Sequence, residues 1–233
     1  MNLFFAEFHS DYALLSVQES QHCLKVLRHR LGDIIWVTEG KGKAIKSEII
    51  QIEYQQVKVA FRETIYYGPK PGPFGLFIAP TKHADRTEWL VEKATELGIQ
   101  QLGFFISQYS ERRHLNMKRI EAIVEAALKQ SQRTIKPVIY EMHPLEFFLN
   151  AHTGPNLGIA HCQPGKKCTL QEWASQKHHM YTLFIGPEGD FSPSEILLAK
   201  TKGAIDISLG EARLRTETAA LYACSVLQAL TIT

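Results

Sequence analysis

Six short apolar runs, each separated from the next by a longer segment, constrain the fold of this chain most strongly. They read FGLFIA, IQQLGFFIS, KPVIYEM, NLGIAH, YTLFI and AIDISL, and they fall between Phe74 and Leu209. Between them, apolar residues recur at helical spacing, most clearly at Ile120, Ile123, Val124, Ala127 and Leu128. This alternation predicts a largely parallel sheet covered by helices on both faces, an α/β domain with its ligand site at the carboxyl ends of the strands.

Capping residues predict where several helices begin and end. Asp85 with Glu88 three residues later predicts a helix start, and Gly98 predicts the end of that helix. The stretch SPSE from Ser192 joins an N-cap serine, a proline at the first helical position and a capping-box glutamate. It predicts a helix that follows YTLFI after one short loop.

A proline- and glycine-rich seam, GPKPGPFG from Gly68 to Gly75, separates this region from a different one. Before the seam lie the strand-like runs NLFFAEF, IIWVT, AIKSEII and VKVAFRETI. One helix is opened there by Ser16, with Glu19 three residues on. We therefore expect a small, mostly β domain over residues 1–70 and the α/β domain over residues 71–233.

Composition excludes several classes of protein. The chain is 45% hydrophobic, but it has no uninterrupted apolar run of about eighteen residues, which a membrane span needs. Its N-terminus, MNLFFAEFHSDY, carries acids where a secretory signal carries basic residues. The four cysteines show no paired spacing, which indicates reduced thiols. We expect a cytoplasmic protein that is not bound to a membrane.

Two glycine-containing loops follow consecutive strands near the C-terminus. GPEGD lies between YTLFI and the helix at Ser192, and the second loop, within LGEARLRTET, lies between AIDISL and the last helix. Gly186 and Gly189 permit backbone angles and close approaches that leave amides and carbonyls free to face a ligand. GPEGD alone fits a plain connection equally well, but a second such loop favours a ligand site. We expect the two strands to be adjacent.

Several stretches of the sequence resemble one known family. IGPEGDFSPSE, LGEARLRTETA, DRTEWLVEKATELGI and EAALKQSQR resemble the 16S rRNA (uracil-N3)-methyltransferases of the SPOUT, or trefoil-knotted, class. HCLKVLRHRLGD resembles a stretch that this family carries on a PUA-like barrel. The resemblance covers nearly the whole chain. It implies an α/β SPOUT trefoil-knot methyltransferase domain with a small N-terminal PUA-like β-barrel domain that binds RNA.

The resemblance also implies S-adenosyl-L-methionine as cofactor, a homodimer formed through the knotted domains, and 16S rRNA or the small ribosomal subunit as partner. The knot rests on the resemblance alone, because ordinary topology rules predict an unknotted, doubly wound sheet. By matching positions, the cofactor contacts would come from Gly186, Glu188, Gly189, Leu209, Gly210, Leu214 and Arg215. The chain departs from the family at Asp190, where a second glycine is common.

Two residues of the last motif are candidates for catalysis. Uracil N3 carries a proton and is a poor nucleophile until that proton leaves, so the site must remove the proton or stabilise the uracil anion. Arg215 is a permanent cation that suits the second role. Glu217 is expected to orient this arginine or, as an alternative, to take the proton. Both residues also fit an ordinary helix start with a favourable acid and a surface arginine, which is the less favoured reading.

Basic residues in both regions are candidates for RNA binding, because they would contact backbone phosphates. Taken singly, each also fits an ordinary solvated surface. The candidates are His22, Lys25, Arg28, Lys82, Arg86, Arg112 and Arg113.

Three other readings remain open. His161, Cys162 and Cys168, with His178 and His179 beyond them, can be drawn as a zinc site, but they lack the usual short cysteine pair, and we expect no metal. A related SPOUT enzyme acting on tRNA or on another rRNA position is the second reading. A non-catalytic RNA-binding factor in ribosome assembly is the third.

Overall fold

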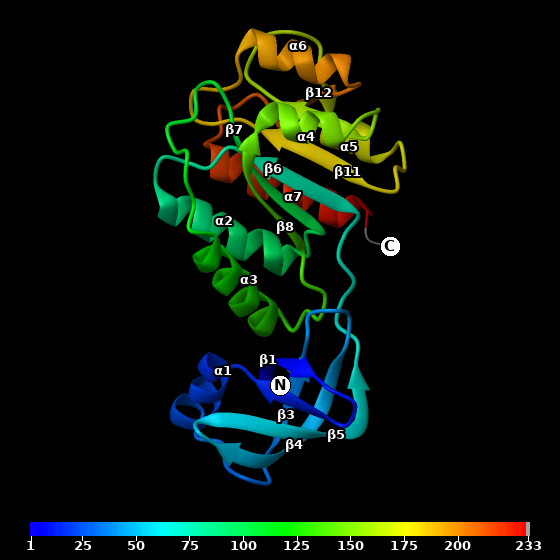
Figure 1. Cartoon of the computed structure of the whole chain (residues 1–233). Helices are drawn as coiled ribbons and strands as arrows, with labels where there is room; N and C mark the ends of the chain where they lie inside the picture. Colours follow the sequence, from blue (N-terminus) through cyan, green and yellow to red (C-terminus); the bar gives the residue numbers. More distant parts are fainter. Residues whose placement is uncertain (232–233) are drawn as a thin grey trace. The chain divides into compact units, whose positions relative to one another are not determined.

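The computed structural model describes residues 1–231 and groups them into two compact units (Figure 1). One unit contains Met1–Lys70 and Glu125–Lys136, and the other contains Pro71–Val124 and the chain from Pro137 onward. The assignment of functional domains to residues 1–70 and 71–233 stays a prediction, and its last two residues lie outside the described part.

The N-terminal unit is built on a closed five-stranded barrel with the strand order β1-β2-β5-β4-β3. Parallel pairing of β1 with β3 closes the barrel. Alternate side chains of each strand point inward and form an apolar core that includes Phe4, Leu15, Ile35 and Val59. The strands are β1 (Leu3–Phe8), β2 (Tyr12–Leu15), β3 (Ile34–Thr38), β4 (Ala44–Glu53) and β5 (Gln56–Tyr66).

The helix predicted after Ser16 is confirmed as α1 (Val17–Gln21). The Ser16 hydroxyl accepts a hydrogen bond from the Glu19 amide over 3.2 Å, as an N-cap residue does. A π-helix, η1 (His22–Val26), follows directly and carries two of the predicted RNA-binding residues, His22 and Lys25.

The second unit contains a seven-stranded, fully parallel sheet with the order β10-β12-β9-β11-β6-β7-β8. All six strands predicted from the sequence are present, and the two-residue strand β10 is an addition. The strands are β6 (Phe74–Ile78), β7 (Gln101–Ile106), β8 (Val138–Pro144), β9 (Leu157–Ala160), β10 (Cys168–Thr169), β11 (Tyr181–Ile185) and β12 (Ile205–Ser208).

Helices cover this sheet on both faces, as the alternation of strands and helices predicted (Figure 1). Helices α4 and α6 pack over Phe77, Phe105 and Phe184, whereas α7 contacts β6, β11 and helix α2. Each fully buried phenylalanine contributes about 1.5–3 kcal/mol by leaving water. The helices are α2 (Ala84–Leu97), α3 (Met117–Ser131), α4 (Leu145–Ala151), α5 (Leu170–Ala174), α6 (Pro193–Thr201) and α7 (Thr216–Thr231).

The predicted start of α6 is confirmed, because Ser192 and Glu195 form a capping box with proline at the first position. The predicted cap of α2 is wrong. His83 is the N-cap residue of α2 and makes no side-chain cap, while Asp85 lies inside the first turn. An acid in the first turn stabilises a helix through the helix dipole. The sequence pattern therefore predicted the correct turn for the helix start but the wrong N-cap residue.

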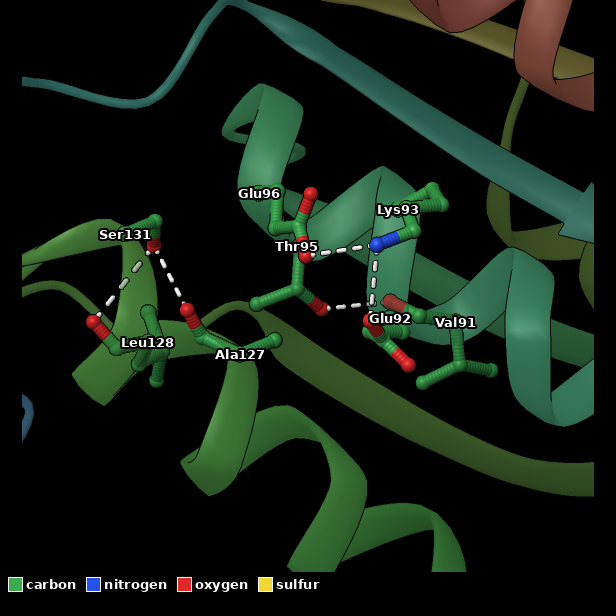
Figure 2. A network of polar contacts seen from close by, with 8 residues as sticks. All are labelled: Val91, Glu92, Lys93, Thr95, Glu96, Ala127, Leu128 and Ser131. Atoms are coloured by element: carbon green, nitrogen blue, oxygen red, sulfur yellow. Dashed lines mark hydrogen bonds and ion pairs between the residues drawn. The ribbon is translucent and has the colours of Figure 1, made fainter.

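Several polar side chains of α2 and α3 bond within their own helices (Figure 2). The Thr95 hydroxyl donates to the Val91 carbonyl over 2.7 Å, and the Ser131 hydroxyl donates to the Ala127 carbonyl over 2.7 Å. Lys93 pairs with two acids of its own helix. These groups are therefore satisfied locally and are not held for a ligand.

No helix within residues 1–231 is long and apolar enough to cross a membrane.

Candidate active site at the carboxyl edge of the sheet

A cavity of about 830 Å³ lies where β9, β11 and β12 end and α7 begins. Its size falls in the range of pockets that bind cofactor-sized molecules. All seven residues predicted to contact the cofactor line this one cavity: Gly186, Glu188, Gly189, Leu209, Gly210, Leu214 and Arg215. The structure thus brings the two predicted loops together, while the role of each residue stays a prediction.

The expectation that the two loop-bearing strands are adjacent is wrong, because β9 lies between β11 and β12 in the sheet. The end of β9 therefore adds Ala160, His161 and Cys162 to the cavity wall. The sequence suggested a role for His161 and Cys162 only as zinc ligands. The signal that would have found them is the apolar run NLGIAH, since a strand inserted between two site strands must end at the same edge.

The first loop, Gly186–Asp190, is a tight turn in which the Asp190 amide donates to the Pro187 carbonyl over 2.9 Å. Gly189 lies so close to the β7–α3 loop that a β-carbon added to it would stand 2.9 Å from the Tyr109 β-carbon. A glycine is needed there because any side chain would collide with the neighbouring loop.

Asp190 has a backbone φ of +65°, in the left-handed region that L-residues seldom adopt. Its Oδ2 atom accepts a hydrogen bond from the Cys162 amide over 2.9 Å. Because Asp190 and Cys162 both line the cavity, this bond joins the β11 loop to the β9 loop across its wall. The departure from the family's glycine thus carries a specific contact.

The second loop crosses the cavity between β12 and α7. Gly210 has a φ of +110° there, with open space where a β-carbon would stand. Arg215 is exposed at the cavity wall, and its backbone carbonyl accepts the Ala219 amide over 2.8 Å at the start of α7. The helix thereby fixes the backbone of Arg215 at the cavity wall.

Glu217 is buried, with only 9% of its side chain exposed, and it pairs with Arg86 of α2 at 3.6 Å. Its Oε2 atom is buried without a hydrogen-bond partner. Glu217 is not among the residues that line the cavity. The partner that the structure shows for Glu217 is thus Arg86, a predicted RNA-binding residue, whereas the sequence had assigned it to Arg215.

His161, Asp206 and Lys200 form a chain of polar side chains beside the cavity. Asp206 lies 3.2 Å from His161 and 2.7 Å from Lys200. Burial alone raises the pKa of Asp206, but Lys200 and His161 beside its carboxylate outweigh this effect and hold the pKa below its ordinary value. This chain fastens the ends of β9 and β12 together. In the described part of the protein, no group of three or more histidine, cysteine or acidic side chains is arranged to hold a metal ion.

The predicted RNA-binding residues divide into two groups by their surroundings. His22, Lys25 and Arg28 are exposed on the barrel unit, and Arg113 is exposed in the other unit. Lys82, Arg86 and Arg112 instead make contacts within their own unit: Lys82 pairs with Glu111, Arg86 with Glu217, and Arg112 with two carbonyls. The hydrogen bond and the charge of Glu111 raise the pKa of Lys82, which stays a cation.

The lining of the cavity fits S-adenosyl-L-methionine chemically. Ile185, Leu209, Leu214 and Ala219 give it an apolar side that suits an adenine ring. The carboxylates of Glu188, Asp190 and Glu211 and the cations of Lys167 and Arg213 also line the cavity, and their charges complement the ammonium, sulfonium and carboxylate groups of that molecule.

Comparison with known families settles the class of this site. A family model described as an RNA methyltransferase domain matches residues 69–228. The chain belongs to this RNA methyltransferase family. Membership confirms the predicted enzyme class and the family seen in the sequence motifs.

Individual relatives of this RNA methyltransferase match over nearly the full chain. Ribosomal RNA small subunit methyltransferase E of Rickettsia conorii is 27% identical over 222 residues, which cover 95% of this chain and 91% of that protein. A probable rRNA-methyltransferase from Porphyromonas gingivalis is 35% identical, with a TM-score of 0.85 over 99% of this chain and 98% of that one.

A third relative was solved with a cofactor. The structure of ribosomal RNA small subunit methyltransferase E from Neisseria gonorrhoeae, bound to S-adenosyl methionine, is 25% identical, with a TM-score of 0.82 over 99% of this chain and 98% of that one. These likenesses extend over both units and confirm the predicted fold class, an α/β methyltransferase domain with a PUA-like barrel.

Proposed function

We propose that this RNA methyltransferase uses S-adenosyl-L-methionine to methylate N3 of a specific uridine in 16S rRNA. The observation that carries the proposal is the single cavity formed by the GPEGD and LGEARLRTET loops together. A protein that only bound RNA would need neither the cavity nor the acids that line it. The cytoplasmic location belongs to the same proposal, because ribosomal RNA is found there.

Two residues of the chain have roles in this reaction, one direct and one indirect. When bound, the cofactor supplies an electrophilic methyl group, so no metal is needed. Arg215 stabilises the negative charge that spreads over the uracil oxygens as the N3 proton passes to a solvent water molecule, and its exposed position at the cavity wall suits this role. Glu217 acts indirectly by orienting Arg86, because its carboxylate faces that arginine.

RNA binding is assigned to exposed cations on both units. Uracil N3 lies on the Watson–Crick edge, so the target base must be unpaired or extruded before the methyl group reaches it. His22, Lys25 and Arg28 on the barrel unit and Arg113 on the other unit hold backbone phosphates. The trefoil knot and a homodimer through the knotted domain are part of the proposal and are supported by the family resemblance.

Two measurements test the proposal. Titration calorimetry with S-adenosyl-L-methionine should show binding at micromolar concentrations, and no binding at high micromolar concentrations would contradict the enzymatic function. Nucleoside mass spectrometry should show 3-methyluridine lost from the 16S rRNA of a deletion strain and restored by the wild-type gene. Unchanged 3-methyluridine with another methylated nucleoside missing would instead favour a different RNA target.

A further inference from the structure

The guanidinium of Arg112 is held by backbone carbonyls of its own unit. Its Nε atom donates to the Thr81 carbonyl over 3.0 Å, and its Nη2 atom donates to the Lys82 carbonyl over 2.6 Å. The rigid, planar guanidinium can bind two successive carbonyls at once along one edge. The backbone of the β6–α2 loop therefore occupies that edge and fixes the orientation of the side chain.

The loop that Arg112 holds also contacts a residue of the cavity. The Lys82 amide donates to Glu188 Oε1 over 3.0 Å, and Glu188 lines the cavity. The Thr81–Lys82 peptide unit thus faces two partners: its carbonyl, from Thr81, accepts from Arg112 Nε, and its amide, from Lys82, donates to Glu188. A shift of this loop would move the donor on which the position of Glu188 depends.

Further contacts fix one end of the β6–α2 loop. The Thr81 hydroxyl donates to the His83 carbonyl over 2.7 Å, and the Thr81 amide donates to the Thr87 hydroxyl over 3.1 Å. Thr81 and Thr87 are fully buried. The Thr81 end of the loop is thus fixed by α2, whereas Lys82 beyond it is exposed and is held by Arg112, by Glu188 and by the ion pair of its own side chain with Glu111.

The next residue, Arg113, provides a natural comparison. It carries the same charge and is exposed, and within residues 1–231 no partner is seen for its side chain. Two neighbouring arginines of the motif ERRH thus have different surroundings, one turned to the backbone and one open to solvent.

We propose that Arg112 is a positioning residue for the cofactor side of the site, acting through the Thr81–Lys82 peptide unit on Glu188, rather than a contact to RNA. The proposal rests on the proposed function for its link to the cofactor. The contacts within the loop do not depend on that function.

The first test follows the loop itself and needs no cofactor. Hydrogen exchange of the Lys82 amide should become at least about tenfold faster in Arg112→Ala, because the loop loses both bonds to a charged donor. Arg112→Lys, which keeps the charge but replaces the planar guanidinium by a single ammonium group, should fall between Arg112→Ala and the wild type. Arg113→Ala should leave this amide unchanged. If the Lys82 amide exchanged at the wild-type rate in the Arg112 variants, the proposal would be overturned. Arg112→Lys keeps this test usable if Arg112→Ala folds poorly.

The second test separates cofactor binding from RNA binding. Arg112→Ala should weaken S-adenosyl-L-methionine binding by roughly tenfold, with RNA affinity almost unchanged, and Arg113→Ala should do the reverse. In a Glu188→Ala background, the effect of Arg112→Ala on cofactor affinity should shrink to less than about twofold, because the two act through one contact. Additive effects, or a loss of RNA affinity alone in Arg112→Ala, would refute the role. Failure of the wild type to bind the cofactor would instead count against the proposed function.

Discussion

Asp190 combines a left-handed backbone with a hydrogen bond to the Cys162 amide, and its variants should separate these two features. Asp190→Asn keeps an acceptor and tolerates positive φ, so it should stay close to the wild type. Asp190→Ala loses the bond and keeps the strain, so the free energy of unfolding should fall by about 1–2 kcal/mol. Asp190→Gly should fall between them. Urea denaturation of the three variants checks this order, and an alanine variant as stable as the asparagine variant would contradict it.

Arg215 lies at the cavity wall, where we propose that it stabilises the negative charge that develops on uracil. Arg215→Ala should lower kcat by about 10²–10³, the range found when a donor to a developing oxyanion is removed. The Kd for S-adenosyl-L-methionine, measured by calorimetry, should change much less. Equal losses in turnover and cofactor affinity would mean that Arg215 serves only the structure of the pocket.

At the scale of elements, the sequence predicted every strand that reaches the cavity but not their order. NLGIAH is recognisable as a strand from its apolar run, and its insertion between β11 and β12 depends on long-range pairing that no local pattern encodes. The site was therefore predicted with two walls, and the third, with His161 and Cys162, was missed. The contact of Glu217 with Arg86 was missed for the same reason, because it joins two helices far apart in the chain.

The link between β9 and β12 through Asp206 gives stability a dependence on pH. The pKa of Asp206 is lower in the folded protein than its ordinary value, so its charged form stabilises the fold at neutral pH. This contribution is present above the unfolded-state pKa and is lost as pH falls through the folded-state value. Asp206→Asn should therefore lower the free energy of unfolding by about 1–2 kcal/mol at pH 7, with a smaller difference below about pH 4. An equal difference at both pH values would contradict this role.

Across the whole molecule, the cysteines differ in their exposure and in whether they line the cavity. Cys162 is exposed and lines it, whereas Cys168 lies outside it, and Cys23 and Cys224 are buried. Burial raises the pKa of Cys23 to about 11 and of Cys224 to about 12, which leaves little reactive thiolate. Iodoacetamide at pH 8 should label Cys162 fastest, and S-adenosyl-L-methionine should slow its labelling without affecting Cys168. Equal protection of both, read by peptide mass spectrometry, would place the cofactor elsewhere.

One cavity, formed where β9, β11 and β12 end, is proposed to hold the methyl donor beside Arg215. A crystal structure of the protein with S-adenosyl-L-methionine would show whether it does. We expect cofactor density in this cavity, in contact with the Gly186–Asp190 loop and with Leu209, Gly210 and Leu214. Density for the cofactor at any other place on the protein, with this cavity filled only by water, would contradict it.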